Sequence, residues 1–135
     1  MIVEHRVIFG DTDQMGVVYY ANYFRYFEFS RSEYFRARGG SYQALEREGY
    51  GLPVIQASCE YKAPAKYEDL VRIRVALADI RRASLRFGYE VFNDATGALL
   101  CTGSTVHACV LGGKPARLPQ AVMRLLTVEP APHHP

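Results

Sequence analysis

The chain has 135 residues, of which 49% are hydrophobic, and a formal net charge of +2 at pH 7. This length fits one domain with a sizeable core, and the hydrophobic content excludes a disordered chain. So small a charge does not indicate a nucleic-acid partner, and no apolar run is long enough for a transmembrane helix or a signal peptide. We expect a cytoplasmic protein without nucleic-acid or membrane partners.

The domain is expected to span residues 1–126, followed by a Pro-rich tail, TVEPAPHHP, at 127–135 that is predicted to be disordered. The cysteines and histidines have no spacing typical of a disulfide framework or a metal site. They are Cys59, Cys101, Cys109, His5, His107, His133 and His134. We therefore expect no metal and no other cofactor.

The first half of the chain predicts a strand and two helices. Residues 2–9 have a β-like pattern and lead into an acidic loop, Asp11-Thr12-Asp13. Aromatic residues then recur at helical spacing as far as Arg36, which predicts a long amphipathic helix that ends before Gly39-Gly40. Ser41 can cap a short second helix. The loop carboxylates thus lie beside a helix N-terminus, whose unpaired N–H groups favour anions.

After Gly51 the pattern changes to strands. Residues 52–62 alternate with Ile55, Ala57, Cys59 and Tyr61 on one side, which predicts a strand with one buried face. Residues 70–79 and 85–91 alternate more strictly, Asn93–Gly97 is typical of a hairpin turn, and residues 98–111 predict a central strand. A short helix is expected at 119–126. The simplest architecture is α+β, an antiparallel sheet wrapped around one long helix.

The run GDTDQMGVVYYANYFRYFE, from Gly10 to Glu28, resembles the hot-dog-fold acyl-CoA thioesterases. The similarity is to the 4-hydroxybenzoyl-CoA thioesterase type and to the short-chain thioesterase of the Tol-Pal cluster, and it extends weakly over residues 2–120. The shared motif is Asp-x-Asp-x-x-Gly-(Ile/Val)-Val-x-(Tyr/His)-x-Asn/Ser-Tyr. The chain departs from it at Gln14-Met15, and Tyr20 is typical of the hydroxybenzoyl branch, whereas the Tol-Pal branch usually has His.

The resemblance implies hydrolysis of an acyl-CoA or acyl-carrier-protein thioester in a hot-dog fold. The family's catalytic carboxylate falls on Asp13, its oxyanion-binding N–H on Tyr20 at the start of the helix, and its loop glycine on Gly16. Asp13 would act as nucleophile or as general base, and the sequence leaves both roles open. Asp11 is expected to be structural.

Other residues are candidates for binding or for the acid. Gly16 and Val17 are candidates for substrate binding, and Tyr20 and Tyr23 are candidates for the acyl pocket. Lys62, Lys66, Arg81 and Arg82 are candidates for the coenzyme A phosphates. Glu28 and Glu33 are alternative catalytic acids, although their alternation with Arg25, Arg31 and Arg36 favours helical ion pairs.

Two other functions remain open, a non-catalytic module that binds acyl thioesters and a hot-dog enoyl-thioester hydratase. The hydratase branch generally carries an Asp/His pair, and no His follows Asp13 at such spacing. An exposed sheet edge and a loop-borne site favour association, so we expect a homodimer with a continuous sheet that pairs into a homotetramer, as in the family.

Overall fold

Strict alternation of apolar and polar residues builds the centre of the sheet. In β4 (Leu70–Ile80) and β5 (Ser84–Asn93) the alternate apolar side chains are fully or almost fully buried, as predicted; they are Val71, Ile73, Val75, Leu77, Leu85, Phe87, Tyr89 and Val91. The two strands pair antiparallel and are joined by the turn at residues 81–83. The predicted Asn93–Gly97 hairpin turn, with Gly97 at a φ of 73°, joins β5 to β6 (Leu99–Ala108). These three strands form the floor of the core.

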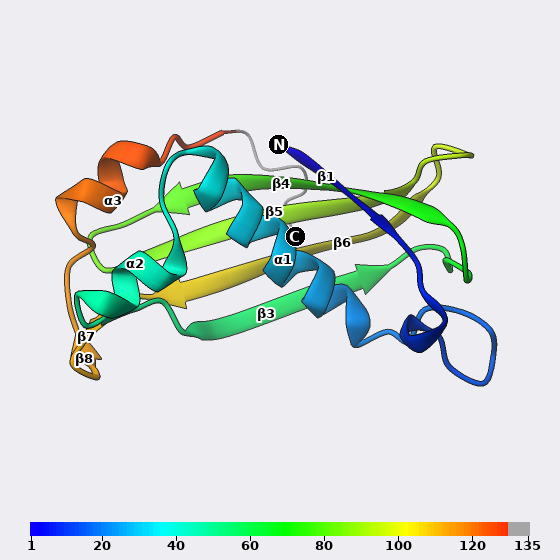
Figure 1. Ribbon diagram of the computed structural model, residues 1–135, viewed down its shortest axis with the longest axis horizontal. Helices are drawn as coiled ribbons and strands as arrows, with labels where there is room; N and C mark the ends of the chain where they lie inside the picture. The colour runs from blue at the N-terminus through cyan, green and yellow to red at the C-terminus, as the bar shows by residue number, and fades with distance from the viewer. Residues whose placement is uncertain (130–135) are drawn as a thin grey trace.

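The chain is described over residues 1–129 in a computed structural model (Figure 1). Five antiparallel strands lie in the order β1-β4-β5-β6-β3, with β1 at Ile2–Arg6 and β3 at Val54–Tyr61. The long helix α1 (Asn22–Ala37) lies across one face of this sheet. This arrangement is the predicted α+β architecture.

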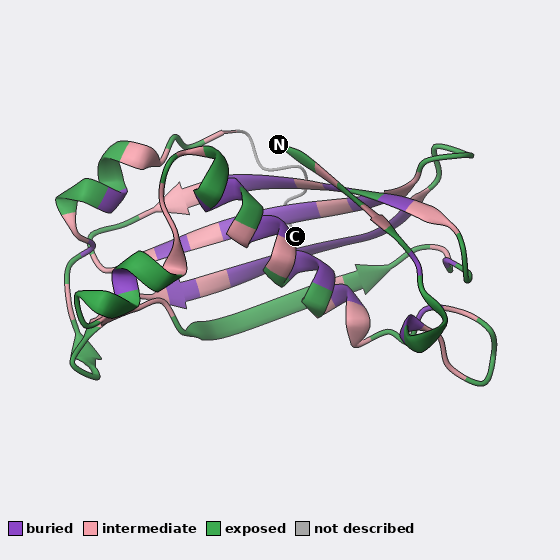
Figure 2. Ribbon diagram, in the orientation of Figure 1, coloured by how far each residue is buried: buried purple, intermediate pink, exposed green. Residues whose placement is uncertain are grey.

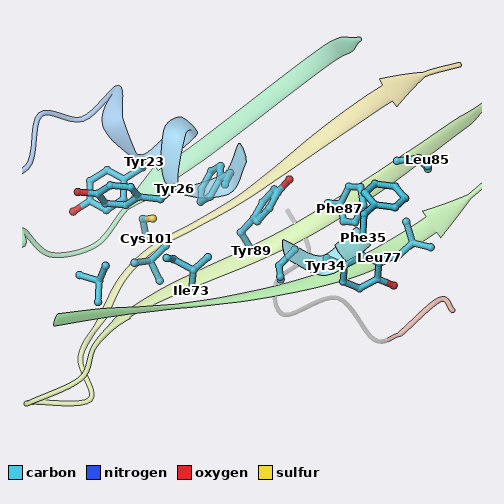
Figure 3. Close-up of a cluster of buried hydrophobic side chains, with 14 of the residues drawn as sticks. Tyr23, Tyr26, Tyr34, Phe35, Ile73, Leu77, Leu85, Phe87, Tyr89 and Cys101 are labelled. Atoms are coloured by element: carbon cyan, nitrogen blue, oxygen red, sulfur yellow. The ribbon is translucent and has the colours of Figure 1, made fainter. Parts of the chain in front are cut away.

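Aromatic rings fill the space between α1 and the sheet (Figure 3). Phe27 of α1 stacks on Tyr89 of β5 with ring centroids 4.2 Å apart. Beneath Phe27, β6 carries Gly103, and a Cβ atom there would lie only 2.5 Å from the ring. The helix approaches β6 closely because that position has no side chain.

The strand β3 departs from its prediction. Its alternation predicts one buried face, but every residue of β3 except Cys59 is exposed, and Ile55 is 62% exposed (Figure 2). The reason is its position at the edge of the sheet, where within residues 1–129 it pairs with β6 alone. An edge of this kind leaves apolar side chains and backbone hydrogen-bonding groups open to a partner.

The charged face of α1 also differs from its prediction. Arg36 and Glu33 form an ion pair, as expected, but Arg31 is only 9% exposed and has no carboxylate within 4.0 Å among residues 1–129. The helical spacing places Arg31 one turn from Phe27 and Tyr34, on the face that packs against the sheet. The predicted role of Arg31 in helical ion pairs is therefore wrong.

Short elements complete the fold. They are the 3-10 helix η1 (Phe9–Asp11), α2 (Tyr42–Arg47), the strands β2 (Tyr50–Gly51), β7 (Val110–Leu111) and β8 (Lys114–Pro115), and α3 (Gln120–Leu125). Ser41 caps α2 as predicted, accepting a hydrogen bond from the Ala44 N–H at 3.0 Å. The last predicted strand divides into β6 and β7, and β7 joins a separate small sheet, β2-β7-β8.

The start of the predicted tail contacts the core. Tyr34 donates a hydrogen bond to the Thr127 carbonyl at 3.3 Å, and the Glu129 N–H donates to the Leu77 carbonyl at 3.0 Å. Residues 130–135 lie outside the described part, so disorder of the tail stays a prediction. In the described part, no helix has the length and hydropathy to cross a bilayer. No cluster of His, Cys, Asp and Glu suited to a metal ion occurs between residues 1 and 129.

Candidate active site

The acidic loop is a small hairpin before α1. Thr12 and Val18 face each other in an antiparallel bridge, and the Asp13 N–H donates to the Val17 carbonyl at 2.9 Å. The turn closes at Gly16, whose N–H donates to the Asp13 carbonyl at 3.0 Å. Gly16 has a φ of 79°, a left-handed conformation that glycine adopts without strain. The turn geometry thus explains the predicted loop glycine.

The Asp13 carboxylate lies at the open end of this hairpin. Its Oδ1 atom accepts a hydrogen bond from the Met15 N–H at 2.9 Å, and the residue is partly exposed. Within residues 1–129 its Oδ2 atom has no hydrogen-bond or ion-pair partner. One carboxylate oxygen is therefore oriented and the other is available for chemistry.

Asp11 has the opposite environment, since it is only 4% exposed. Its Oδ2 atom accepts hydrogen bonds from the Ile8 N–H at 3.1 Å and the Tyr26 hydroxyl at 3.0 Å, and lies 2.9 Å from His5 Nε2. Burial raises the pKa of Asp11, but the hydrogen bonds from His5, Ile8 and Tyr26 outweigh it and lower the pKa from its ordinary value. Asp11 is thus held as a buried carboxylate that joins the loop to β1 and α1.

The Asp11 carbonyl ties the far arm of the loop to the helix. It accepts hydrogen bonds from the Tyr19 N–H and from the Asn22 side-chain amide, both at 2.8 Å. The helix α1 begins at Asn22, so Tyr20 lies in the preceding turn and not at the helix start, where it was predicted. No acceptor for the Tyr20 N–H is found in the described chain. That donor is free to bind an incoming oxygen.

Beside this turn lies a pocket of about 310 Å³. It is lined by Val18, Tyr20, Tyr23, Tyr61, Lys62, Ala63 and Pro64. The structure thus brings together Tyr20 and Tyr23, the two aromatic residues predicted for an acyl pocket. Asp13, Gly16 and Val17 belong to the hairpin and do not line the pocket.

Tyr61 connects the pocket wall to the Tyr20 peptide. Its hydroxyl donates to the Tyr20 carbonyl at 2.8 Å, and burial raises the Tyr61 pKa, which keeps that hydroxyl protonated. Its ring also lies edge-on to that of Tyr23, with centroids 5.6 Å apart. The carbonyl of Tyr20 is therefore anchored in the turn that carries its N–H.

The four basic candidates divide between the two ends of the sheet. Lys66 bridges Val17 through the backbone, and Lys62 lines the pocket and pairs with Glu60 at 2.9 Å. Arg81 and Arg82 lie in the turn between β4 and β5, at the end of the sheet away from the acidic loop (Figure 1). One chain therefore brings only the two lysines close to its own loop.

The two alternative acids lie further along α1. Glu33 is paired with Arg36, and Glu28 is exposed on the helix surface. Neither side chain lines the pocket beside the acidic loop. The structure therefore groups Asp13, and not Glu28 or Glu33, with the Tyr20 turn.

Sequence reasoning missed two residues at this site, His5 and Tyr61. His5 had no metal-ligand spacing, and nothing in the sequence indicates that β1 would bring it to Asp11. Tyr61 occupies an inward position of the predicted strand 52–62, which signals packing but not its bond to Tyr20. Both contacts depend on how distant segments meet in three dimensions.

Comparison with known proteins places this fold and loop in a family. Residues 7–126 match the thioesterase-like superfamily. The acyl-CoA thioester hydrolase YbgC of Escherichia coli is 36% identical over 87% of this chain and 89% of its own length. A hypothetical protein of Aquifex aeolicus has a solved structure that covers 94% of this chain and 99% of its own, with a TM-score of 0.90 and 34% identity.

A DHNA-CoA thioesterase from Staphylococcus aureus is also similar in structure. It is 33% identical with a TM-score of 0.85, over 91% of this chain and 83% of its own. The chain belongs to the thioesterase-like superfamily. The predicted hot-dog fold and the predicted recognition as an acyl-CoA thioesterase are confirmed by these relatives.

Proposed function

We propose that this enzyme hydrolyses acyl-CoA thioesters with Asp13 and the Tyr20 N–H on opposite sides of the reacting carbonyl. One observation carries the proposal: a single hydrogen-bonded loop, anchored by Asp11, presents a free carboxylate oxygen and a free backbone N–H beside an aromatic pocket. These are the two groups that acyl transfer from a thioester requires.

The Tyr20 N–H stabilises the oxyanion. As the thioester carbonyl becomes tetrahedral, its oxygen gains negative charge and accepts a hydrogen bond from this donor, which precedes the positive end of α1. Removal of one such donor costs about 3–4 kcal/mol of transition-state stabilisation in well-studied acyl-transfer enzymes. The bond from Tyr61 to the Tyr20 carbonyl keeps the peptide in position.

Asp13 supplies the attacking oxygen. As general base it takes a proton from water while the water oxygen bonds to the acyl carbon, and collapse of the tetrahedral species expels the thiolate, giving the free acid and CoA thiol. As nucleophile its carboxylate oxygen bonds to the acyl carbon, the carbon–sulfur bond breaks and the CoA thiolate leaves, and water then cleaves the mixed anhydride to the free acid and the Asp13 carboxylate. Mass spectrometry of Asp13 under single-turnover conditions distinguishes the routes, since only the second leaves an acyl adduct.

Coenzyme A is the thiol carrier that the relatives' names favour. Lys62 and Lys66 flank the loop and are suited to its phosphates, whereas Arg81 and Arg82 can serve only a loop from another chain. The relatives include both an acyl-CoA thioester hydrolase and a DHNA-CoA thioesterase.

The assembly we propose is a homodimer that joins through β3 and pairs again into a homotetramer. The support is the exposed edge: Val54, Ile55 and Tyr61 are 45%, 62% and 44% exposed on a strand that pairs on one side only. Pairing two copies of β3 would continue the sheet and cover these side chains. Light scattering at micromolar concentration tests this, and a monomer would contradict it.

The proposed reaction is tested by incubating the protein with a panel of acyl-CoAs and measuring the release of free thiol. A thioesterase releases one thiol for each acid formed. A binding module takes up acyl-CoA without releasing thiol, and a hydratase removes the enoyl double bond, also without releasing thiol. Either of those outcomes for the whole panel would refute the proposal.

A further inference from the structure

The strongest unexplained feature outside the loop is the buried guanidinium of Arg31. Its residue is 9% exposed, and the side chains around it are the neutral Tyr42, Tyr89 and His107. No carboxylate of residues 1–129 lies within 4.0 Å of it. A buried cation without a counter-charge carries a desolvation cost that an anionic group could offset.

A second unsatisfied group lies beside it. The hydroxyl of Tyr42 is buried close to Arg31 and has no well-formed hydrogen bond with any group of residues 1–129. Most buried hydroxyls are hydrogen-bonded, so an orphan indicates a missing partner. Arg31 and Tyr42 together present donors for an oxygen acceptor such as a carboxylate.

Both residues line one groove of about 690 Å³. Its other walls come from α1, from α2 and from the chain between Gly51 and Val54 where β3 begins. Exposed Glu28, Glu33 and Glu46 also line it, and Glu33 pairs with Arg36, but charges open to water are screened more strongly than a charge that is 9% exposed, as Arg31 is. The groove is large enough for a small organic group.

The groove and the pocket beside the acidic loop lie at opposite ends of β3. Val54 begins the strand at the groove, and Tyr61 ends it at the pocket. Eight strand residues separate those ends by about 23 Å, too far for one small substrate. If two β3 strands pair antiparallel, Val54 of one copy lies near Tyr61 of the other, so each groove comes beside the partner's loop.

From this arrangement we propose that Arg31 and Tyr42 bind a carboxylate at the far end of the acyl group whose thioester is cleaved at the partner's loop. The substrate class is therefore an acyl-CoA with a dicarboxylic acyl group. This inference rests on the proposed function and on the β3 dimer, and it assigns the groove a role in choosing among acyl groups.

The test compares glutaryl-CoA with pentanoyl-CoA, which have five-carbon acyl chains and differ by the terminal carboxylate. We expect kcat/KM to favour glutaryl-CoA by about tenfold or more, the effect of one charge-assisted hydrogen bond. Arg31→Met should remove most of this preference, and Tyr42→Phe should reduce it by about threefold or more. Arg47→Met, at an exposed position of α2, controls for the lost charge and should keep the preference.

Tyr42→Phe remains decisive if Arg31→Met does not fold, because it removes only a hydroxyl that has no well-formed hydrogen bond within residues 1–129. Equal kcat/KM for the two substrates, or a preference that survives Tyr42→Phe, would overturn the inference and leave thioester hydrolysis intact. The inference would also be overturned if Arg31→Met lost the dimer but kept the preference for glutaryl-CoA, since Arg31 would then pair with a group of the second copy and not with the substrate. Binding of both substrates to Asp13→Asn measures the same preference without the reaction, so failure of the proposed chemistry is seen separately.

Discussion

Nε2 of His5 and Oδ2 of Asp11 lie 2.9 Å apart and join the first strand to the acidic loop. The same Oδ2 atom accepts from Ile8 and Tyr26, so one buried oxygen holds the strand, the loop and α1 together. Asp13, two residues later, does not join these elements, because its side chain accepts a hydrogen bond only from the Met15 N–H of its own turn within residues 1–129. The two acids of the motif are thus distinguished by burial and by the number of donors around each.

Asp11→Ala should destabilise the fold. The change leaves the buried Tyr26 hydroxyl and the Ile8 N–H without their acceptor, which typically costs about 1–3 kcal/mol for each unsatisfied group. The free energy of unfolding in urea measures the loss. Asp94→Ala is the control, because this exposed residue approaches Arg72 only at 3.7 Å and should matter by less than about 1 kcal/mol. Equal stability of the two variants would contradict the role of Asp11.

His107 makes stability depend on pH. It is fully buried, its Nδ1 lies 3.0 Å from the Leu52 carbonyl and its Nε2 lies 2.9 Å from Thr105 Oγ1. A carbonyl only accepts, so Nδ1 carries the hydrogen and Nε2 accepts from Thr105. Burial lowers the pKa of His107 to about 4, with a smaller lowering by the charge of Arg31. The folded protein therefore holds this ring neutral.

The unfolded chain binds a proton at His107 near pH 6.5, whereas the folded chain does so only near pH 4. The contribution of the neutral His107 ring to the free energy of unfolding is therefore fully present above pH 6.5. It falls by up to about 3 kcal/mol as the pH drops from 6.5 to about 4. His107→Gln should flatten the urea-derived stability curve between these pH values relative to the parent. If the free energy of unfolding of His107→Gln and of the parent changed in parallel with pH, His107 would not titrate as described.

Tyr61→Phe should slow the reaction. The change removes the hydrogen bond to the Tyr20 carbonyl, so the peptide that carries the proposed oxyanion donor loses an anchor. A neutral hydrogen bond is worth about 0.5–1.5 kcal/mol, which corresponds to a fall in kcat of about 2- to 10-fold. Tyr67→Phe, at an exposed tyrosine without a hydrogen bond from its hydroxyl in residues 1–129, is the matched control. Similar kcat values for both variants would exclude positioning by Tyr61.

Gly103→Ala should disrupt the packing of α1. The new methyl group would lie 2.5 Å from the Phe27 ring and 2.7 Å from the Ser58 carbonyl oxygen, so the helix or the edge strand must shift. Overpacking of this kind costs about 1–3 kcal/mol in the free energy of unfolding. Phe27→Leu added to Gly103→Ala should recover part of the loss. A single variant within about 0.5 kcal/mol of the parent would mean that α1 does not approach β6 so closely.

Local pattern was enough to predict much of this fold. Alternation in β4 and β5 defined both the strands and their buried faces, and Ser41 defined a helix cap, because each depends on residues close in sequence. The acidic loop could be found from Asp11, Asp13 and Gly16 because a tight turn needs particular residue types at adjacent positions.

Features that depend on distant contacts could not be predicted in this way. The alternation in β3 did not indicate that the strand would lie at the edge of the sheet with most of its residues exposed. The charge of Arg31 favoured a solvated ion pair, yet its place on α1 directs it to the core. The contact of His5 with Asp11 requires β1 to lie beside the loop, which follows from its pairing with β4.

The most direct test of the account is acyl-CoA hydrolysis by Asp13→Asn beside Asp11→Asn, with melting temperatures for both. Asparagine keeps the size of Asp13 and an acceptor for the Met15 N–H, but it removes the negative oxygen that either mechanism needs. We expect Asp13→Asn to fold like the parent and to lose about 10²–10⁴ in turnover, and Asp11→Asn to lose mainly stability. Near-parental turnover by Asp13→Asn, on a substrate that the parent hydrolyses well, would contradict the assignment and make Glu28 or Glu33 the next candidate.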